Sequence, residues 1–273
     1  MGHADVERYL ARIGLRPSGV RSDLAGLSAL QHAHLAHVPF ENLDIVFAGG
    51  VAHDREVAFD KIVDRHRGGW CFELNGVFAR LLEALGFDVV MLGAAVLLGG
   101  PSTVLEHVAL EVSGGPDGLE PHFVDVGFGD GTVRPLALNR SGPQDGGNGS
   151  YELIGSPQGT TLARLVDGVP AAQLRFKRVA HHFDDFASVA TSMQVDPDKH
   201  WRSKPFATRL TGADTTDRVT LTADRLKIER ADGSVDERSV GVTEWDGVLA
   251  DRFGMQRPGP WPPAATRASR VDG

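Results

Sequence analysis

Apolar residues recur at helical spacing in the first third of the chain, over residues 6–13, 24–35, 59–66 and 71–85. The last of these segments is the clearest. Its apolar residues fall at i, i+4, i+7, i+8 and i+11, which places them on one face of a helix: Leu74, Phe78, Leu81, Leu82 and Leu85. Gly86 follows where helices often end in the left-handed conformation. We predict helices over all four segments, with Ser22 as the N-cap of the second.

The spacing changes after residue 86. Strand-length apolar segments separated by Gly- and Pro-rich turns follow, and they are 89–98, 107–112, 122–126, 151–154, 161–165 and 174–178. This pattern is typical of an antiparallel sheet or barrel. The last third combines a hairpin pattern, at 219–221 and 226–228, with a helix that begins near Thr243 and ends before Gly254. We therefore predict an α+β chain organised as 1–86, 87–190 and 191–273, with a frayed tail over 258–273.

The composition excludes several classes of protein. A hydrophobic fraction of 41% and a charged fraction of 23% are ordinary for a globular protein. The net charge of −8 argues against a nucleic-acid binder, which needs surplus Lys and Arg to neutralise phosphates. No apolar run approaches the roughly 20 residues that cross a bilayer, and the N-terminus lacks the features of a secretory signal. We expect a cytoplasmic protein that binds neither nucleic acid nor membrane.

The single cysteine, Cys71, rules out an internal disulfide and a multi-thiolate zinc site. It directly follows Gly68-Gly69-Trp70 and lies in the first turn of the clearest predicted helix. There the unpaired backbone N–H groups and the helix dipole favour a thiolate, and they could also stabilise an oxyanion on a substrate. A lone cysteine is more often a small buried apolar residue. On these grounds the nucleophile and the buried filler remain open alternatives.

A nucleophilic cysteine needs a base, and the base needs a group that orients it. If the strands on either side of the turn 114–118 form a hairpin centred on Pro116, His107 and Asp125 lie opposite or nearly opposite each other. An aspartate facing a histidine fixes one imidazole tautomer and raises its basicity. An exposed polar pair on a solvated sheet face would give the same pattern, so the spacing leaves both interpretations open.

Two histidine-rich segments raise the question of a metal site. Residues 32–37 contain three histidines in a predicted helix, where surface histidines are the simpler interpretation. Residues 181–185, His-His-Phe-Asp-Asp, fit the polar side of an amphipathic segment anchored by Phe183 and Phe186. We expect no metal at either place.

Four sequence blocks resemble those of the arylamine N-acetyltransferase family. They are VPFENLD at 38–44, RGGWCFELN at 67–75, EHVAL at 106–110 and VDVGFG at 124–129. They stand in the family's order and spacing. The resemblance implies an N-terminal helical bundle, a central antiparallel β-barrel and a C-terminal α/β lid, with a cysteine-protease-like core formed by a triad of Cys71, His107 and Asp125.

The resemblance also implies an activity, which is ping-pong transfer of an acetyl group from acetyl-CoA through a Cys71 thioester. The acceptors would be arylamines, arylhydrazines or N-hydroxyarylamines. It implies contacts to coenzyme A from Gly127, Phe128 and Gly129, an apolar substrate pocket formed by Phe40, Val96, Phe128 and Phe206, and a structural ion pair between Arg67 and Glu41.

Three other functions stay open from the sequence. An amide synthase that closes a macrolactam would use the same triad on a carrier-bound acyl group. A thiol hydrolase of the papain or transglutaminase type shares the Cys, His, Asp order and would release a free acid. A non-catalytic binding domain would hold Cys71 as a structural residue.

Overall fold

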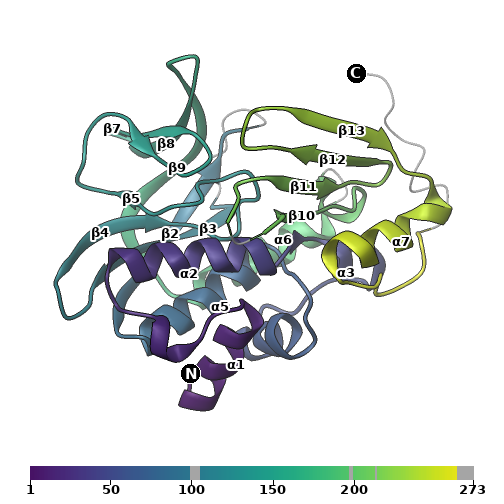
Figure 1. The fold of residues 1–273 in the computed structure, drawn as a ribbon, viewed down its shortest axis with the longest axis horizontal. Helices are drawn as coiled ribbons and strands as arrows, with labels where there is room; N and C mark the ends of the chain where they lie inside the picture. Colours follow the sequence, from purple (N-terminus) through teal and green to yellow (C-terminus); the bar gives the residue numbers. More distant parts are fainter. Residues whose placement is uncertain (99–104, 197–198, 213, 263–273) are drawn as a thin grey trace.

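The structure, a computed structural model, describes residues 1–98, 105–196, 199–212 and 214–262. A layer of helices lies against a curved antiparallel sheet, and a second sheet with its own helix lies beside them (Figure 1). The fold is α+β, as predicted. Most of the predicted frayed tail lies outside the described residues. Within the described part, no helix is both long enough and apolar enough to cross a membrane.

The helical layer contains the four predicted helices with two corrections. Its members are α1 (His3–Arg12), α2 (Leu24–His37), α3 (Leu43–Phe47), α4 (Arg55–Phe59) and α5 (Cys71–Ala84). The third predicted helix begins earlier than expected, at Arg55, and continues after Phe59 as a π-helix over Asp60–Asp64. The N-cap of α2 is Asp23 and not Ser22, because Asp23 Oδ1 accepts from Gly26 N at 2.8 Å. The Ser22 hydroxyl instead donates to the carbonyl of Leu85 at the end of α5.

Helix α5 is the centre of the core. Leu74, Val77, Phe78 and Leu81 are fully buried, because α1 and α4 pack on one side and strands β2 (Phe87–Val96) and β3 (His107–Gly114) on the other. Burying each such side chain contributes about 1.5–3 kcal/mol. From Cys71 to Leu82 every residue except Arg80 is buried, so this part of the helix cannot rotate or slide without opening the core, and its first residue is fixed in space.

The large sheet has eight antiparallel strands in the order β5-β4-β3-β2-β9-β8-β7-β6. Besides β2 and β3 they are β4 (Leu119–Val124), β5 (Leu136–Ala137), β6 (Gln144–Asp145), β7 (Ser150–Ser156), β8 (Gly159–Val166) and β9 (Val169–His181). On β3, Val108 and Leu110 pack into the helical core, whereas Ala109 packs into a separate barrel core with Phe123. The side chains of β3 therefore alternate between the two cores with a period of two.

After β9 come the short helix Phe183–Phe186 and α6 (Ala187–Val195), where Phe183 and Phe186 are buried as predicted. The second sheet follows, in the order β1-β10-β11-β12-β13. Its strands are β1 (Phe40–Glu41), β10 (Ala207–Leu210), β11 (Arg218–Leu221), β12 (Arg225–Glu229) and β13 (Val235–Ser239). Helix α7 (Val242–Phe253) ends at Gly254 with φ 67°, as the sequence predicts. Strand β1 comes from the N-terminal part, so residues 40–41 belong to a sheet otherwise built from residues 207–239.

His34 of α2 is buried inside the helical layer. Its Nδ1 lies 3.0 Å from Tyr9 Oη, and its Nε2 has no hydrogen-bond partner within the described part of the chain. Burial, and then the charge of Arg12, lower the pKa of His34 to about 3. The folded protein therefore keeps this imidazole neutral at any pH above that value.

We expect His34 to make the fold sensitive to mild acid. The unfolded chain takes up a proton at His34 near pH 6.5 and the folded chain only near pH 3, so stability is full above pH 6.5 and falls as the pH drops. The loss is at most about 1.4 kcal/mol per pH unit. His34→Gln should flatten the fall in melting temperature between pH 7 and pH 5, and His3→Gln at an exposed site should not. Equal slopes for the wild type and His34→Gln would contradict this assignment.

Candidate active site

Cys71 is the first residue of α5 and is almost fully buried. The helix start is held by Glu73, whose Oε2 accepts from the backbone N–H of Trp70 at 3.2 Å. The backbone N–H groups of this first turn have no acceptor within the helix. The structure thus places the thiol at the positive end of a helix dipole, where the sequence predicted it.

The two glycines before the helix let another part of the chain lie against it. Gly69 N donates to Pro39 O at 3.1 Å, and Gly69 O accepts from Glu41 N at 2.9 Å. A Cβ added at Gly68 would lie 2.2 Å from Pro39 O, so a larger residue would push the two segments apart. As a result, Phe40 is held at the same cavity as Cys71.

A buried cluster of charges lies beneath this turn and consists of Glu41, Asp44, Lys61, Arg67 and Glu73. Lys61 Nζ lies 2.8 Å from Asp44 and 3.1 Å from Glu73. Arg67 Nη2 lies 3.2 Å from Glu41 and 3.1 Å from Asp44. The predicted ion pair of Arg67 with Glu41 is confirmed. The sequence analysis missed Lys61, because a single lysine in an amphipathic helix usually points to solvent.

His107 and Asp125 meet as expected, but in another register. His107 Nε2 lies 2.6 Å from Asp125 Oδ2, and both side chains are buried. Strands β3 and β4 pair Leu110 with Val124, which puts Asp125 two residues away from the position opposite His107. The turn pairs Gly114 with Leu119, one residue beyond a hairpin centred on Pro116, and a bulge next to the turn adds the second residue of the offset. An offset of two keeps both residues on the same face, so the side chains still meet diagonally.

Asn75 fixes Asp125 and was given no role in the sequence analysis. Its Nδ2 donates to Asp125 Oδ1 at 2.9 Å and to Val108 O at 2.7 Å. Its Oδ1 accepts from Val126 N at 3.1 Å. Gly127 N also donates to Asp125 Oδ1, at 2.8 Å. Asp125 therefore has one oxygen held by the scaffold and the other free to orient His107.

The electrostatics favour a charged imidazole. Burial lowers the pKa of His107, but the charge and hydrogen bond of Asp125, followed by smaller contributions from Cys71, raise it to about 10. Asp125 engages Nε2, which leaves Nδ1 as the nitrogen for Cys71. Cys71 Sγ lies 4.0 Å from the carbonyl oxygen of Glu106, the residue before His107. Such an arrangement can take the thiol proton onto the imidazole and leave a thiolate.

A cavity of about 320 Å³ opens onto Cys71 and His107. All four predicted pocket residues line it: Phe40, Val96, Phe128 and Phe206. Phe128 contacts the His107 ring edge-on, with centroids 5.4 Å apart. The sequence analysis missed Trp201, which lines the cavity and contacts both Phe40 and Phe206. The sequence around Trp201 has no clear hydrophobic pattern, and only the tertiary fold brings this residue to the site.

The glycines at 127 and 129 have a structural reason within the protein itself. A Cβ at Gly127 would lie 2.8 Å from Cys71 Cα, and one at Gly129 would lie 3.0 Å from the Phe40 ring. Both glycines therefore allow the loop to pack against the protein's own site residues. Gly127 lines the small cavity together with Phe128. Contacts of these residues to coenzyme A remain a prediction.

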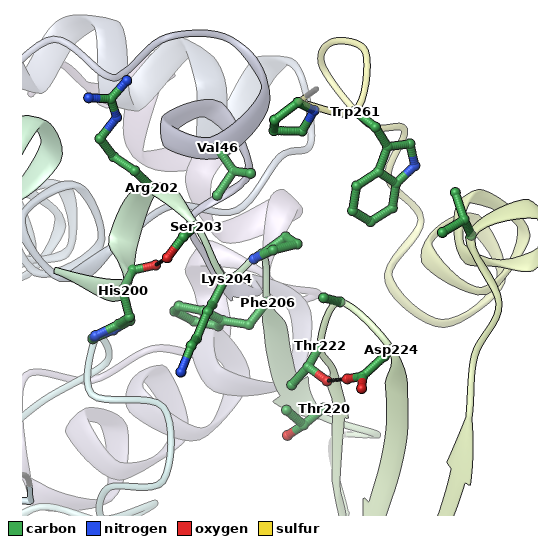
Figure 2. Close-up of a pocket in the computed structure, with 14 residues that line it drawn as sticks. Val46, His200, Arg202, Ser203, Lys204, Phe206, Thr220, Thr222, Asp224 and Trp261 are labelled. Atoms are coloured by element: carbon green, nitrogen blue, oxygen red, sulfur yellow. Dashed lines mark hydrogen bonds between the residues drawn. The ribbon is translucent and has the colours of Figure 1, made fainter. Parts of the chain in front are cut away.

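A larger cavity of about 750 Å³ adjoins the first, because His200 and Phe206 line both. Figure 2 shows that Lys204 and His200 lie on one side of it, with Thr220, Thr222 and Trp261 on the others. Arg202 also lines the cavity. The wall is mainly apolar with basic side chains from one short segment, 200–204, and the sequence analysis did not identify it.

The histidine-rich segments have local partners. His34 contacts Tyr9, His37 Nδ1 lies 2.9 Å from Ala33 O, and His32 Nε2 lies 3.2 Å from Thr215 O. Among the described residues, no group of three or more His, Cys, Asp or Glu is placed so that it could hold a metal ion.

Comparisons with known proteins agree on one family. A family model described as N-acetyltransferase matches residues 23–258. The chain is 34% identical over 262 residues to an arylamine N-acetyltransferase of Mycolicibacterium smegmatis, covering 92% of each chain. It is 27% identical to human arylamine N-acetyltransferase 1, covering 92% of this chain and 94% of that one.

Solved structures give the same result. The arylamine N-acetyltransferase of M. smegmatis superposes with a TM-score of 0.84 at 30% identity, covering 92% of both chains. The Mycobacterium marinum arylamine N-acetyltransferase, solved in complex with CoA, superposes with a TM-score of 0.82 at 29% identity, covering 91% of this chain and 92% of that one.

We expect Lys61→Met to destabilise the protein strongly. The substitution leaves two buried carboxylates, Glu41 and Glu73, and the partly buried Asp44 beside one arginine, and breaking such a cluster typically costs about 3–5 kcal/mol. Urea unfolding followed by tryptophan fluorescence measures the change. Lys227→Met is the matched control, because Lys227 pairs with Glu229 at a solvent-exposed site and should lose at most about 1 kcal/mol. If both variants lose the same free energy, the buried cluster does not stabilise the turn before α5.

Proposed function

Since this chain belongs to the arylamine N-acetyltransferase family of acyltransferases, we propose that it transfers an acetyl group from acetyl-CoA to arylamines through a thioester on Cys71. The observation that supports this most directly is the buried array of Cys71, His107 and Asp125 beside an apolar cavity. The array supplies a nucleophile, a base and an orienting carboxylate in one place.

In the first half-reaction, His107 accepts the proton of the Cys71 thiol and Asp125 stabilises the imidazolium. The thiolate attacks the thioester carbonyl of acetyl-CoA, and the bond between the acetyl carbon and the CoA sulfur breaks. The CoA thiolate leaves and takes the proton from His107. Exchange of one thioester for another is nearly isoenergetic, so the acetyl-enzyme can form reversibly.

In the second half-reaction, the amine nitrogen attacks the acetyl carbonyl on Cys71. His107 accepts the proton that the amine loses, and the carbon–sulfur bond to Cys71 breaks. The products are an N-acetylated arylamine and the original thiolate–imidazolium pair. Backbone N–H groups at the start of α5 would stabilise the oxyanion in both steps, a contribution of about 3–4 kcal/mol in comparable sites.

The small cavity suits a flat aromatic acceptor. Phe40, Phe128, Trp201 and Phe206 present ring faces and edges around it, and rings in such pairs favour a further ring at offset or edge-on contact. At about 320 Å³ it admits an arylamine, an arylhydrazine or an N-hydroxyarylamine next to Cys71.

The larger cavity is the natural place for coenzyme A. It meets the small cavity at His200 and Phe206, so a pantetheine chain could pass from one to the other. Arg202 and Lys204 on its lining supply positive charge for phosphates in a chain whose net charge is −8. The M. marinum enzyme was solved in complex with CoA, which supports binding of the same cofactor here.

Intact-mass spectrometry after incubation with acetyl-CoA tests the central step. The wild type should gain the mass of one acetyl group, and adding 5-aminosalicylate or isoniazid should remove it with formation of the acetylated product. Cys71→Ala should fold normally and gain no acetyl group. Loss of the adduct as free acetate without an acceptor would favour a thiol hydrolase. No adduct from acetyl-CoA in the wild type would contradict the proposal and favour another acyl donor.

The pH dependence of alkylation tests the ion pair separately. The pKa of His107 at about 10 keeps the imidazolium present throughout the neutral range, and the pair is lost only as the pH rises through that value. If Cys71 forms the proposed thiolate pair with this imidazolium, iodoacetamide should modify it at similar rates at pH 6 and pH 8, whereas an ordinary thiol reacts on the order of 100-fold more slowly at pH 6 than at pH 8. His107→Gln should restore this steep dependence. A wild-type rate that falls like that of an ordinary thiol would exclude the pair.

A further inference from the structure

A third cavity, of about 360 Å³, shares no lining residue with the two described above. It lies behind the loop that carries Phe128, because Phe128 lines the Cys71 cavity whereas Asp130 lines this one. Its other walls come from the glycine-rich loop 147–149, Arg164 of β8, Arg218 of β11 and the β12–β13 turn. The lining is mostly polar, which distinguishes it from the apolar site near Cys71.

Arg218 is a buried cation without a carboxylate partner. Its side chain is almost fully buried, and its Nη1 lies 3.4 Å from Thr208 Oγ1, at the long end of the hydrogen-bond range. Its Nη2 is buried with no partner, and no carboxylate of the described residues lies within ion-pair distance of it. Burial lowers the pKa of Arg218, and the more distant Asp130 and Glu229 offset this only in part. A buried guanidinium without a carboxylate partner is stabilised when an anion binds to it.

The other charges around the cavity already have partners. Arg164 Nη1 lies 3.1 Å from Asp130 Oδ2, and its Nη2 donates to Asn148 O at 2.8 Å. Glu229 accepts from Lys227 at 2.8 Å. Arg230 pairs with Asp236. With these three pairs formed, Arg218 carries the only charge without an ion-pair partner among the described residues that line the cavity.

We propose that this cavity binds a small oxyanion of the phosphate type, with Arg218 as its principal ligand. A guanidinium presents parallel N–H groups that match two oxygens of a phosphate. Arg164 and Arg230 also line the cavity, but Asp130 and Asp236 already balance their charges. Glycine at 149 leaves room for Arg164, since a Cβ there would lie 3.3 Å from Arg164 Nε. The cavity shares no lining residue with the cavity at Cys71.

Thermal unfolding with increasing inorganic phosphate, at constant ionic strength set with chloride, tests the site on the full chain. We expect the wild-type melting temperature to rise by about 2–4 °C at about ten times the dissociation constant. Arg218→Met removes the cation but keeps an apolar stem, so it should lose this rise. Arg218→Lys should keep part of it. Arg178→Met, at an exposed arginine paired with Glu111, is the control and should respond like the wild type.

Broadening of the ³¹P resonance of phosphate by the wild-type protein gives a second readout that does not depend on any variant folding. Phosphate could be free or could belong to the 3′-phosphate of coenzyme A. Competition for the signal by CoA but not by dephospho-CoA would assign the site to the cofactor, and competition by neither would assign it to a free anion. An unbroadened resonance with an unchanged melting temperature, or an equal response in Arg218→Met, would overturn the proposal.

Discussion

The side-chain amide of Asn75 is the contact on which the site depends. It is fully buried and bridges helix α5 to the strand β3 and to the residues that follow β4. Cys71 belongs to the helix, His107 to β3 and Asp125 to the end of β4, so three elements must keep one relative position. An unmade hydrogen bond at a buried amide costs about 1–3 kcal/mol. Any displacement of the helix along the sheet would break several such bonds at once.

A second constraint acts from the opposite side of Cys71. The buried cluster around Lys61 and Arg67 holds the segment before the cysteine, and the bridge between Gly69 and Pro39 ties that segment to Phe40. The nucleophile is thus fixed by hydrogen bonds through Asn75 and by charges through Glu73. Neither the hydrogen bonds of Asn75 nor the charges around Glu73 involve the sulfur of Cys71. The part of the cavity next to this sulfur is therefore free for substrate.

Much of the fold and of the site could be predicted from the sequence, because these parts follow from local patterns of apolar and polar residues. The helix spacing located α5 and Cys71, and the strand segments on either side of the turn 114–118 predicted the hairpin that brings His107 to Asp125. The predictions that failed concern features without a local pattern. The exact pairing of β3 with β4 depends on the length of the turn and on a bulge beside it, so Asp125 is offset from His107. Lys61 and Trp201 reach the site through packing of segments far apart in the chain. Arg218 looks like any strand arginine until the fold buries it.

Strand β1 has a consequence for the order in which the molecule is assembled. Phe40 pairs with Thr208 and Glu41 with Ala207, so a wall of the cavity is closed by residues more than 160 positions apart in the sequence. Closing a loop of that length is entropically costly and slow relative to local helix formation. The core of the helical layer also contains Trp201 and Leu210, so the last third of the chain completes that core as well as the pocket. Trp201 and Phe206 line the cavity at Cys71 although they follow the nucleophile by about 130 positions, so the site is finished only when both ends of the chain have come together.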